Sequence, residues 1–265
     1  MIKPPPTIRV FIVGVSGSGK STAAWRLYLE RFPRRILIDQ TGEWEERADI
    51  VVYDTQEFSW ALRKYAPLGR WTICFPVLDD TDFTELVDYL IPVPDTESSP
   101  VRLMHGAVIL VDEIDLIAPP RTSKREVRTL MRRSRHAGLS VVTCTQRPES
   151  VSREVSAQSD HILCMHLVEP DAFDYMGKIM RVDLRTALPE WIARHPHGGL
   201  WRAPLTGKTL WLTESGELVA AREPEPEPER AAAGAAVLPS SSRGDGGAGP
   251  EEGQEEEEEE EPSSL

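Results

Sequence analysis

Short apolar runs rich in β-branched residues recur along the first 170 residues, and a stretch with helical periodicity follows most of them. Strands that are apolar on both faces are typical of a parallel sheet covered by helices on both sides. The sequence therefore predicts an α/β fold with a mostly parallel sheet. The expected strands cover residues 7–14, 34–39, 49–53, 71–75, 106–112, 139–145 and 161–167. The expected helices cover residues 20–31, 56–65, 82–90, 123–136, 150–157 and 171–179, and a small hairpin is expected at residues 198–213.

The carboxyl-terminal segment, residues 222–265, has a composition unlike the rest of the chain. It carries 14 acidic and 3 basic residues, so most of the whole-chain formal charge of −13 belongs to it. A segment this polar and this charged buries too little apolar surface to fold. We expect one globular domain at residues 1–221, which is long enough to bury a substantial core, followed by a disordered acidic tail at residues 222–265.

The composition also bears on where the protein works. Its three cysteines are widely separated and each lies inside an apolar run, as in proteins of a reducing compartment. The first residues lack the apolar core of a signal peptide, and the sequence has no run of the roughly 18 apolar residues that a membrane-spanning helix needs. We expect a soluble, cytoplasmic protein with no transmembrane segment.

The segment GVSGSGKS, residues 14–21, lies between the first expected strand and the first expected helix. It fits the pattern G-x-x-x-x-G-K-[ST] in full, and the glycines of this pattern let successive backbone N–H groups turn toward one phosphate at a helix amino terminus. Lys20 then reaches the β- and γ-phosphates of ATP, and the Ser21 hydroxyl is a ligand for Mg²⁺. The residues expected to bind the nucleotide are Gly14, Ser16, Gly17, Ser18, Gly19, Lys20, Ser21 and Thr22.

The run AVILVDE, residues 107–113, ends in two acids. A buried parallel strand here places Asp112 at its carboxyl end, beside the phosphate loop, where the carboxylate can hold Mg²⁺ through water. Glu113 is then the expected group that polarises the water attacking the γ-phosphate. Nucleoside kinases share the phosphate loop, but transfer to an acceptor usually needs no such glutamate. The pair of acids therefore favours ATP hydrolysis over phosphate transfer.

A polar residue, Gln146, follows the buried run at residues 139–145. If this strand lies beside the strand that ends at Asp112, the Gln146 amide reaches the same edge of the sheet and can bond the γ-phosphate or the attacking water. A glutamine at a strand end is also common in ordinary turns. In the expected hairpin, Trp201 and Trp211 are the two candidates for a contact with the adenine.

The stretch between these two motifs is basic. On a helix, Arg128, Arg132 and Arg135 fall on one face, because they are spaced by four and three residues. Such a face can simply be solvated, can bring an arginine to the nucleotide of a neighbouring subunit, or can contact the phosphates of nucleic acid. The basic residues of the stretch are Arg121, Lys124, Arg125, Arg128, Arg132, Arg133 and Arg135.

Four segments together resemble the HerA and FtsK superfamily of P-loop ATPases that translocate DNA. They are GVSGSGKS, IDQTGEW at residues 38–44, ILVDEID at residues 109–115 and SRHAGLSVVTCTQRPESV at residues 134–151. The resemblance implies a RecA-like P-loop core of the ASCE type. It also implies a homo-oligomeric ring, usually of six subunits, with ATP between neighbours and double-stranded DNA in the central channel.

The same resemblance assigns roles to individual residues. It implies a hydrolytic set that consists of Lys20, Ser21, Asp112, Glu113 and Gln146. Arg135 is the first candidate for an arginine that acts on the ATP of the neighbouring subunit. Further candidates for that role are Arg132, Arg147 and Arg153.

The globular part is little more than a motor core, and in this it resembles the genome-packaging ATPases of tailless viruses with an internal membrane. That likeness implies packaging of viral DNA into a capsid, in the host cytoplasm or at the virion, with capsid or membrane-vertex proteins as further partners. The alternatives are plasmid or conjugative DNA transfer, a HerA-like translocase, a nucleotide-gated assembly module without translocation, and a small-molecule kinase.

Overall fold

The computed structural model describes residues 6–77, 80–92, 101–118 and 125–220. One compact unit extends from Met1 to Ala221, and residues 222–265, where a disordered tail is expected, lie outside the described residues. Within the described part of the chain, ten strands form one sheet in the order β10-β9-β8-β7-β1-β6-β5-β2-β4-β3. The strands are β1 Arg9–Val13, β2 Arg34–Asp39, β3 Ile50–Val51, β4 Trp71–Pro76, β5 Val108–Val111, β6 Ser140–Thr145, β7 His161–Cys164, β8 Gly199–Ala203, β9 Lys208–Leu212 and β10 Leu218–Ala220.

The strand order determines which loops meet. Strands β1 to β7 are parallel, whereas β8, β9 and β10 extend the sheet as antiparallel strands. Strand β6 lies between β1 and β5, with Val13 opposite Thr145 and Val111 opposite Thr143. The carboxyl ends of β1, β6 and β5 therefore lie side by side at one edge of the sheet. The predicted α/β fold with a carboxyl-terminal hairpin is confirmed.

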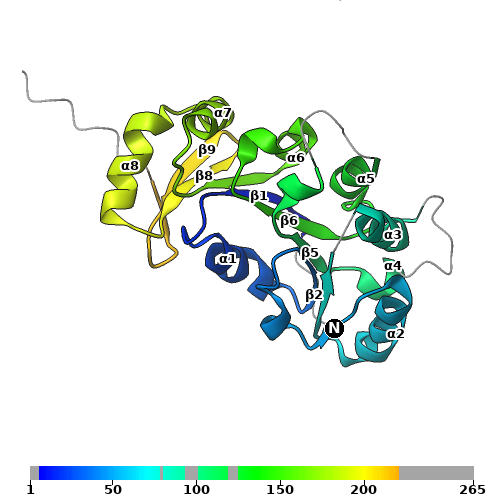
Figure 1. The fold of residues 1–265 in the computed structure, drawn as a ribbon. Coiled ribbons are helices and arrows are strands. Elements are labelled where there is room, and N and C mark those ends of the chain that lie inside the picture. Colours follow the sequence, from blue (N-terminus) through cyan, green and yellow to red (C-terminus); the bar gives the residue numbers. More distant parts are fainter. Residues whose placement is uncertain (1–5, 78–79, 93–100, 119–124, 221–265) are drawn as a thin grey trace, which may run out of the picture. The chain divides into compact units, whose positions relative to one another are not determined.

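Helices cover both faces of the sheet (Figure 1). Helix α1, Lys20–Ala23, continues into a π-helical turn at Ala24–Tyr28 and a 3₁₀ turn at Leu29–Arg31, so this helical segment has the predicted extent. None of the helices among the described residues is long and apolar enough to cross a membrane. The other helices are α2 Thr55–Tyr65, α3 Asp80–Leu90, α4 Val101–Met104, α5 Arg125–Arg133, α6 Arg153–Gln158, α7 Pro170–Met180 and α8 Leu184–Arg194.

Successive side chains of each central strand enter two different apolar cores. In β1, Phe11 and Val13 pack in the core that includes residues of α2, α3, α5, α6, α7 and α8. Val10 and Ile12 pack in the core that includes residues of the segment following the phosphate loop. All four side chains are fully buried. Because both faces are covered, the strands read in the sequence as continuous apolar runs.

The fold differs from the prediction in several elements, one of which is the short helix α4, which was not predicted. Helix α8 and strand β10 were not predicted, and α8 contains Pro189, which is an unfavourable residue inside a helix. Helix α5 ends at Arg133, so Arg135 lies in the turn that follows and not on a helix face with Arg128 and Arg132. Arg121 and Lys124 lie outside the described residues.

Candidate active site

The phosphate loop connects β1 to α1 and is anchored to the end of β6 and to the segment that follows β7. The Gly14 N–H donates to the Thr145 carbonyl at 3.2 Å, and the Val15 N–H donates to the His166 carbonyl at 2.9 Å. Gly17 and Gly19 have φ angles of 73° and 93°, a left-handed conformation that costs glycine little. These two glycines let the loop curve around a space in which its backbone N–H groups can surround a phosphate.

Lys20 and Ser21 open the helix that follows the loop. The Lys20 side chain is buried, and its ammonium group donates to the Val15 carbonyl at 3.2 Å, which holds it across the loop. The Ser21 hydroxyl donates to Glu43 Oε2 at 3.1 Å. A cation and a hydroxyl thus lie at the amino terminus of the same helix, where an anion is favoured.

Asp112, directly after β5, is a buried carboxylate with three hydrogen-bond donors. The indole N–H of Trp44 donates to Oδ2 at 2.8 Å, the Thr41 hydroxyl donates to the same oxygen at 3.5 Å, and the Glu113 N–H donates to Oδ1 at 3.1 Å. Burial raises the pKa of Asp112 above its ordinary value, and the Trp44 hydrogen bond opposes that shift. The orientation of this carboxylate therefore depends on the loop after β2.

That loop, residues 39–44, is folded around a second buried acid. The Asp39 carboxylate accepts hydrogen bonds from the N–H groups of Thr41, Gly42 and Trp44, at 2.8 to 3.0 Å. The turn brings the Trp44 ring to Asp112 and the Glu43 carboxylate to Ser21. The block IDQTGEW, quoted above for its resemblance, is thus part of the site.

Glu113 and Gln146 are in direct contact. Gln146 Nε2 donates to Glu113 Oε1 at 2.7 Å, and the Gln146 backbone N–H donates to Oε2 at 3.2 Å. Glu113 has a φ of 43°, which is rare for a residue with a side chain and indicates a constrained position. Burial raises the pKa of Glu113, while the hydrogen bond from Gln146 and the charge of Lys20 oppose the shift. The structure therefore brings the glutamine to the carboxylate that follows β5.

The residues near Ser21 fit a magnesium ion. Ser21, Asp112 and Glu43 line one cavity and offer only hard oxygen donors. Among the described residues, no cluster of three or more His, Cys, Asp or Glu side chains is arranged to hold a metal by itself. Mg²⁺ usually binds one or two carboxylates and completes its shell with water and substrate phosphates, so this sparse set is compatible with it.

The cavity has a volume of about 550 Å³ and is lined by predicted and unpredicted residues. Most predicted site residues contribute, among them Lys20, Glu113 and Gln146. The expected hairpin contributes Leu212 and Thr213, and further lining residues lie in the connections before β8 and between β9 and β10, where no sequence motif identifies them. The unpredicted lining residues are Ala23, Arg26, Leu27, Glu43, His197, Leu212, Thr213, Glu214 and Gly216.

Trp201 and Trp211, the two candidates for a contact with the adenine, have partners elsewhere in the fold. The Trp201 indole N–H donates to the Tyr28 hydroxyl at 3.1 Å, and the ring is buried. Trp211 stacks on Trp191 with ring centroids 4.8 Å apart. Neither tryptophan lines the cavity.

The candidate arginines fall at two edges of the sheet. Arg147 directly follows Gln146, and Arg153 begins α6, so both lie toward the carboxyl ends of the strands. Arg135 precedes β6 and forms an ion pair with Asp160, directly before β7. Arg132 forms an ion pair with Glu154. Arg135 therefore lies at the amino edge, opposite the phosphate loop of its own chain.

No protein-family model and no curated protein matches this sequence. Among solved structures, the genome packaging NTPase B204 from Sulfolobus turreted icosahedral virus 2, in complex with AMPPCP, is 16% identical with a TM-score of 0.60, and the match covers 78% of this chain and 97% of that chain. The DNA-packaging ATPase B204 from Sulfolobus Turreted Icosahedral Virus is 17% identical with a TM-score of 0.58 and the same coverage. This chain is similar in fold to a viral genome-packaging NTPase.

The similarity confirms the P-loop core that the sequence motifs predicted. It extends over nearly the whole length of B204, and the same virus 2 protein has also been solved with AMP, at 17% identity and a TM-score of 0.59. Because the identity is this low, the likeness to B204 is one of fold alone.

Proposed function

We propose that this protein is an ATPase that assembles into a homo-oligomeric ring, hydrolyses ATP with bound Mg²⁺ and translocates double-stranded DNA into a viral capsid. The observation that carries the proposal is the contact of Gln146 with Glu113 beside Lys20, within one cavity of nucleotide-binding size. A phosphate loop alone would suit many reactions. A glutamate with a hydrogen-bonded amide beside that loop suits hydrolysis that responds to the γ-phosphate.

Each residue then has a role that follows from its position. The phosphate loop and Lys20 bind the β- and γ-phosphates, and Ser21 and Asp112 would hold Mg²⁺, which neutralises phosphate charge when bound. Glu113 accepts a proton from the attacking water; its raised pKa makes the carboxylate a better base. The Gln146 amide can bond either Glu113 or the γ-phosphate, so its position depends on whether the triphosphate is intact.

A second subunit is part of the proposal because of the position of Arg135. Strand β1 has five residues, so the amino edge of the sheet is roughly 13 Å from the start of the phosphate loop, at about 3.3 Å per residue. Arg135 at that edge is therefore suited to the ATP of a neighbour in a head-to-tail ring. An arginine supplied in this way accelerates phosphoryl transfer by stabilising charge in the transition state.

The basic surface of α5 supports the proposed contact with DNA. Arginines separated along one helix can contact successive phosphates, and the side chains of Arg132 and Arg125 are 59% and 63% exposed while paired with Glu154 and Asp88. The side chains around a shallow hollow on α5 are Arg125, Arg128, Thr129, Arg132 and Arg133.

The same proposal includes capsid or membrane-vertex proteins as partners and a location in the host cytoplasm or the virion.

The test combines a DNA-dependent ATPase assay with displacement of a third strand from duplex DNA. We expect long duplex to stimulate ATP hydrolysis by the wild type and ATP to drive displacement. Glu113→Gln should bind ATP and oligomerise, but neither hydrolyse ATP nor displace the strand. Glu190→Gln, the same change on an exposed part of α8, is the control and should behave as wild type.

The outcomes separate the proposal from its alternatives. Hydrolysis that ignores DNA would favour a nucleotide-gated assembly module, and phosphate transfer to an acceptor without a ring would favour a kinase. Displacement from circular plasmid as well as linear viral DNA would favour a transfer role over packaging. Turnover by Glu113→Gln at the wild-type rate would refute the assigned role of Glu113.

A further inference from the structure

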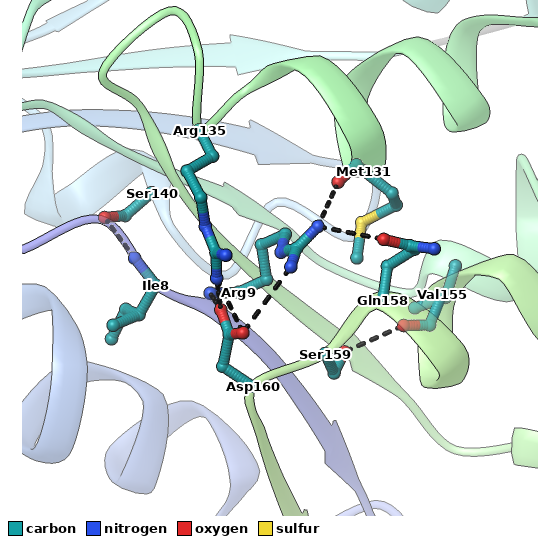
Figure 2. A network of polar contacts seen from close by, with 9 residues as sticks. All are labelled: Ile8, Arg9, Met131, Arg135, Ser140, Val155, Gln158, Ser159 and Asp160. Carbon is teal, nitrogen blue, oxygen red and sulfur yellow. Dashed lines mark hydrogen bonds and ion pairs between the residues drawn. The ribbon is translucent and has the colours of Figure 1, made fainter. Parts of the chain in front are cut away.

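Asp160 is the centre of a polar network at the amino edge of the sheet, away from the cavity (Figure 2). It directly precedes β7, while Arg9 begins β1 and Arg135 lies in the turn before β6. Three segments that are far apart in the sequence thus meet at one carboxylate. None of the roles proposed above uses this acid.

The carboxylate of Asp160 is held in one orientation. Its side chain is 11% exposed, and Oδ2 accepts the Arg9 backbone N–H at 2.9 Å. The Arg9 guanidinium contacts Oδ1 at 3.5 Å and is itself fixed, because its Nη1 donates to the Met131 carbonyl at 2.9 Å and to Gln158 Oε1 at 3.0 Å. Burial would raise the pKa of Asp160, but the hydrogen bonds from Arg135 and Arg9 outweigh it and keep the pKa below its ordinary value. Asp160 is therefore ionised at neutral pH.

Arg135 uses only one of its nitrogens for this contact. Its Nη2 donates to both Asp160 oxygens, at 2.6 and 2.7 Å. Its side chain is 44% exposed, and Nε and Nη1 have no acceptor among the described residues. The guanidinium is thus held at one end while its other N–H groups are available to an anion.

A second ion pair of the same region shows a different geometry. Arg132 donates to Glu154 through Nε at 2.6 Å and through Nη2 at 3.0 Å, so one whole edge of its guanidinium is used inside the chain. The side chain of Glu154 is 13% exposed, close to the value for Asp160. The side chains of the two acids have similar exposed fractions, and each forms a short ion pair with a more exposed arginine. Asp160 also contacts Arg9, and the two pairs differ in how much of the exposed guanidinium stays free.

We infer that Asp160 is a positioning residue, which orients the Arg135 guanidinium so that its free N–H groups face the γ-phosphate of ATP bound by an adjacent subunit. This inference rests on the proposed function. A long arginine side chain loses freedom when it binds an anion, and a carboxylate that orders it beforehand lowers that cost. Arg9 has a supporting part, because it holds Asp160.

The test measures ATP turnover of the full-length protein at concentrations where the ring has formed, for Asp160→Asn, Arg135→Ala, the double variant and Glu154→Gln. Asparagine keeps an oxygen that can accept the Arg9 N–H. We expect Asp160→Asn to lower kcat by about 10- to 100-fold, because a displacement of about 1 Å of a group that acts on the transition state can have an effect of this size. Its affinity for a fluorescent ATP analogue and its oligomeric state should remain those of the wild type, whereas its Tm should fall, because the charge of Asp160 stabilises the fold beside Arg9 and Arg135.

Two comparisons make the result specific. Adding Asp160→Asn to Arg135→Ala should cause no further loss of kcat, because the acid acts through the arginine. Glu154→Gln, the matched control, should leave kcat unchanged. If Asp160→Asn does not fold, Asp160→Glu keeps the charge and moves the guanidinium by one methylene, and a lowered kcat at unchanged ATP affinity is again expected.

Several results would overturn the inference. The inference fails if Asp160→Asn has the kcat of the wild type or, where that variant does not fold, if Asp160→Glu has it. It also fails if kcat increases, because the ion pair would then keep the arginine away from the ATP. Losses that multiply in the double variant would indicate a general structural role, and a loss in Glu154→Gln alone would point to Arg132. If Arg135→Ala itself turns over normally, the proposed role of Arg135 fails; if only Asp160→Asn is normal, the proposed function stands and this inference fails.

Discussion

Replacing Trp44 with phenylalanine removes the hydrogen bond that holds the buried Asp112 carboxylate. Trp44 is 1% exposed, and its ring lies beside Trp25 with centroids 6.3 Å apart and beneath the Arg47 guanidinium at 5.2 Å. The substitution removes roughly three buried heavy atoms, worth about 2 kcal/mol of transfer free energy. It also removes a hydrogen bond to a charged group, worth about 1.5–3 kcal/mol. We therefore expect the free energy of unfolding at pH 7 to fall by about 3–5 kcal/mol.

Trp71→Phe is the matched control. Trp71 is fully buried in β4, but its indole nitrogen has no hydrogen-bond partner among the described residues. Trp71→Phe removes the same number of buried atoms, but it also removes a buried donor that has no partner. Such a donor destabilises the folded state by about 1–3 kcal/mol, so its removal offsets the lost burial. The control should therefore lower the free energy of unfolding by about 1 kcal/mol or less.

The pH dependence distinguishes the hydrogen bond from the loss of volume. The folded-state pKa of Asp112 is raised by burial, so its contribution to stability is present below the unfolded pKa and is lost as pH rises through the folded pKa. The Trp44 hydrogen bond lowers that pKa, so removing it raises the folded-state pKa of Asp112 further. Trp44→Phe should therefore lower the free energy of unfolding more at neutral pH than in acid. Urea unfolding at pH 7 and near pH 4 should show a larger effect of Trp44→Phe at pH 7, and a pH-independent effect of Trp71→Phe. Equal effects of Trp44→Phe at both pH values would refute the assignment of the hydrogen bond to the carboxylate.

Two other changes test the cavity. Gln146→Ala should lower kcat for ATP by about 10²- to 10³-fold, as expected when a polar group that acts on the transition state is removed, while the affinity for a fluorescent ATP analogue changes little; a fall in affinity with normal kcat would contradict this. Gly19→Ala and Gly207→Ala both place a side chain on a left-handed residue, with φ of 93° and 71°, and each should lower the free energy of unfolding by roughly 1–2 kcal/mol. Only Gly19→Ala should also weaken ATP binding, and equal affinities of the two variants would count against the phosphate-loop geometry.

The parts of the fold that could be predicted carry local signals. Strands β1, β5 and β6 are buried on both faces. Each is therefore an apolar run that can be recognised from its own residues alone. The contact of Gln146 with Glu113 was predictable once those runs were taken as adjacent strands, because parallel strands end at a common edge. The residues of the phosphate loop were predictable because its conformation depends on glycines at fixed spacing.

What could not be predicted depends on pairing over long sequence separations. The Trp44 bond to Asp112 joins loops after two different strands, and no pattern within either loop identifies the partner. The pairing of Arg135 with Asp160 depends on the strand order, and the expected continuation of α5 led to the wrong helix face. His197, Glu214 and Gly216 were not predicted as lining residues, because they lie in the connections before β8 and between β9 and β10, whose positions depend on long-range strand pairing.

The most direct test of the central claim, a site completed by two subunits, is to mix two inactive variants. Glu113→Gln lacks the proposed base but keeps Arg135, and Arg135→Ala has the opposite defect. In a head-to-tail ring assembled from equal amounts of both, roughly a quarter of the interfaces combine an intact Glu113 with a neighbour's intact Arg135. We predict that the mixture recovers about that fraction of the wild-type ATPase rate. Co-assembled rings with no more activity than the two variants measured separately would contradict the account.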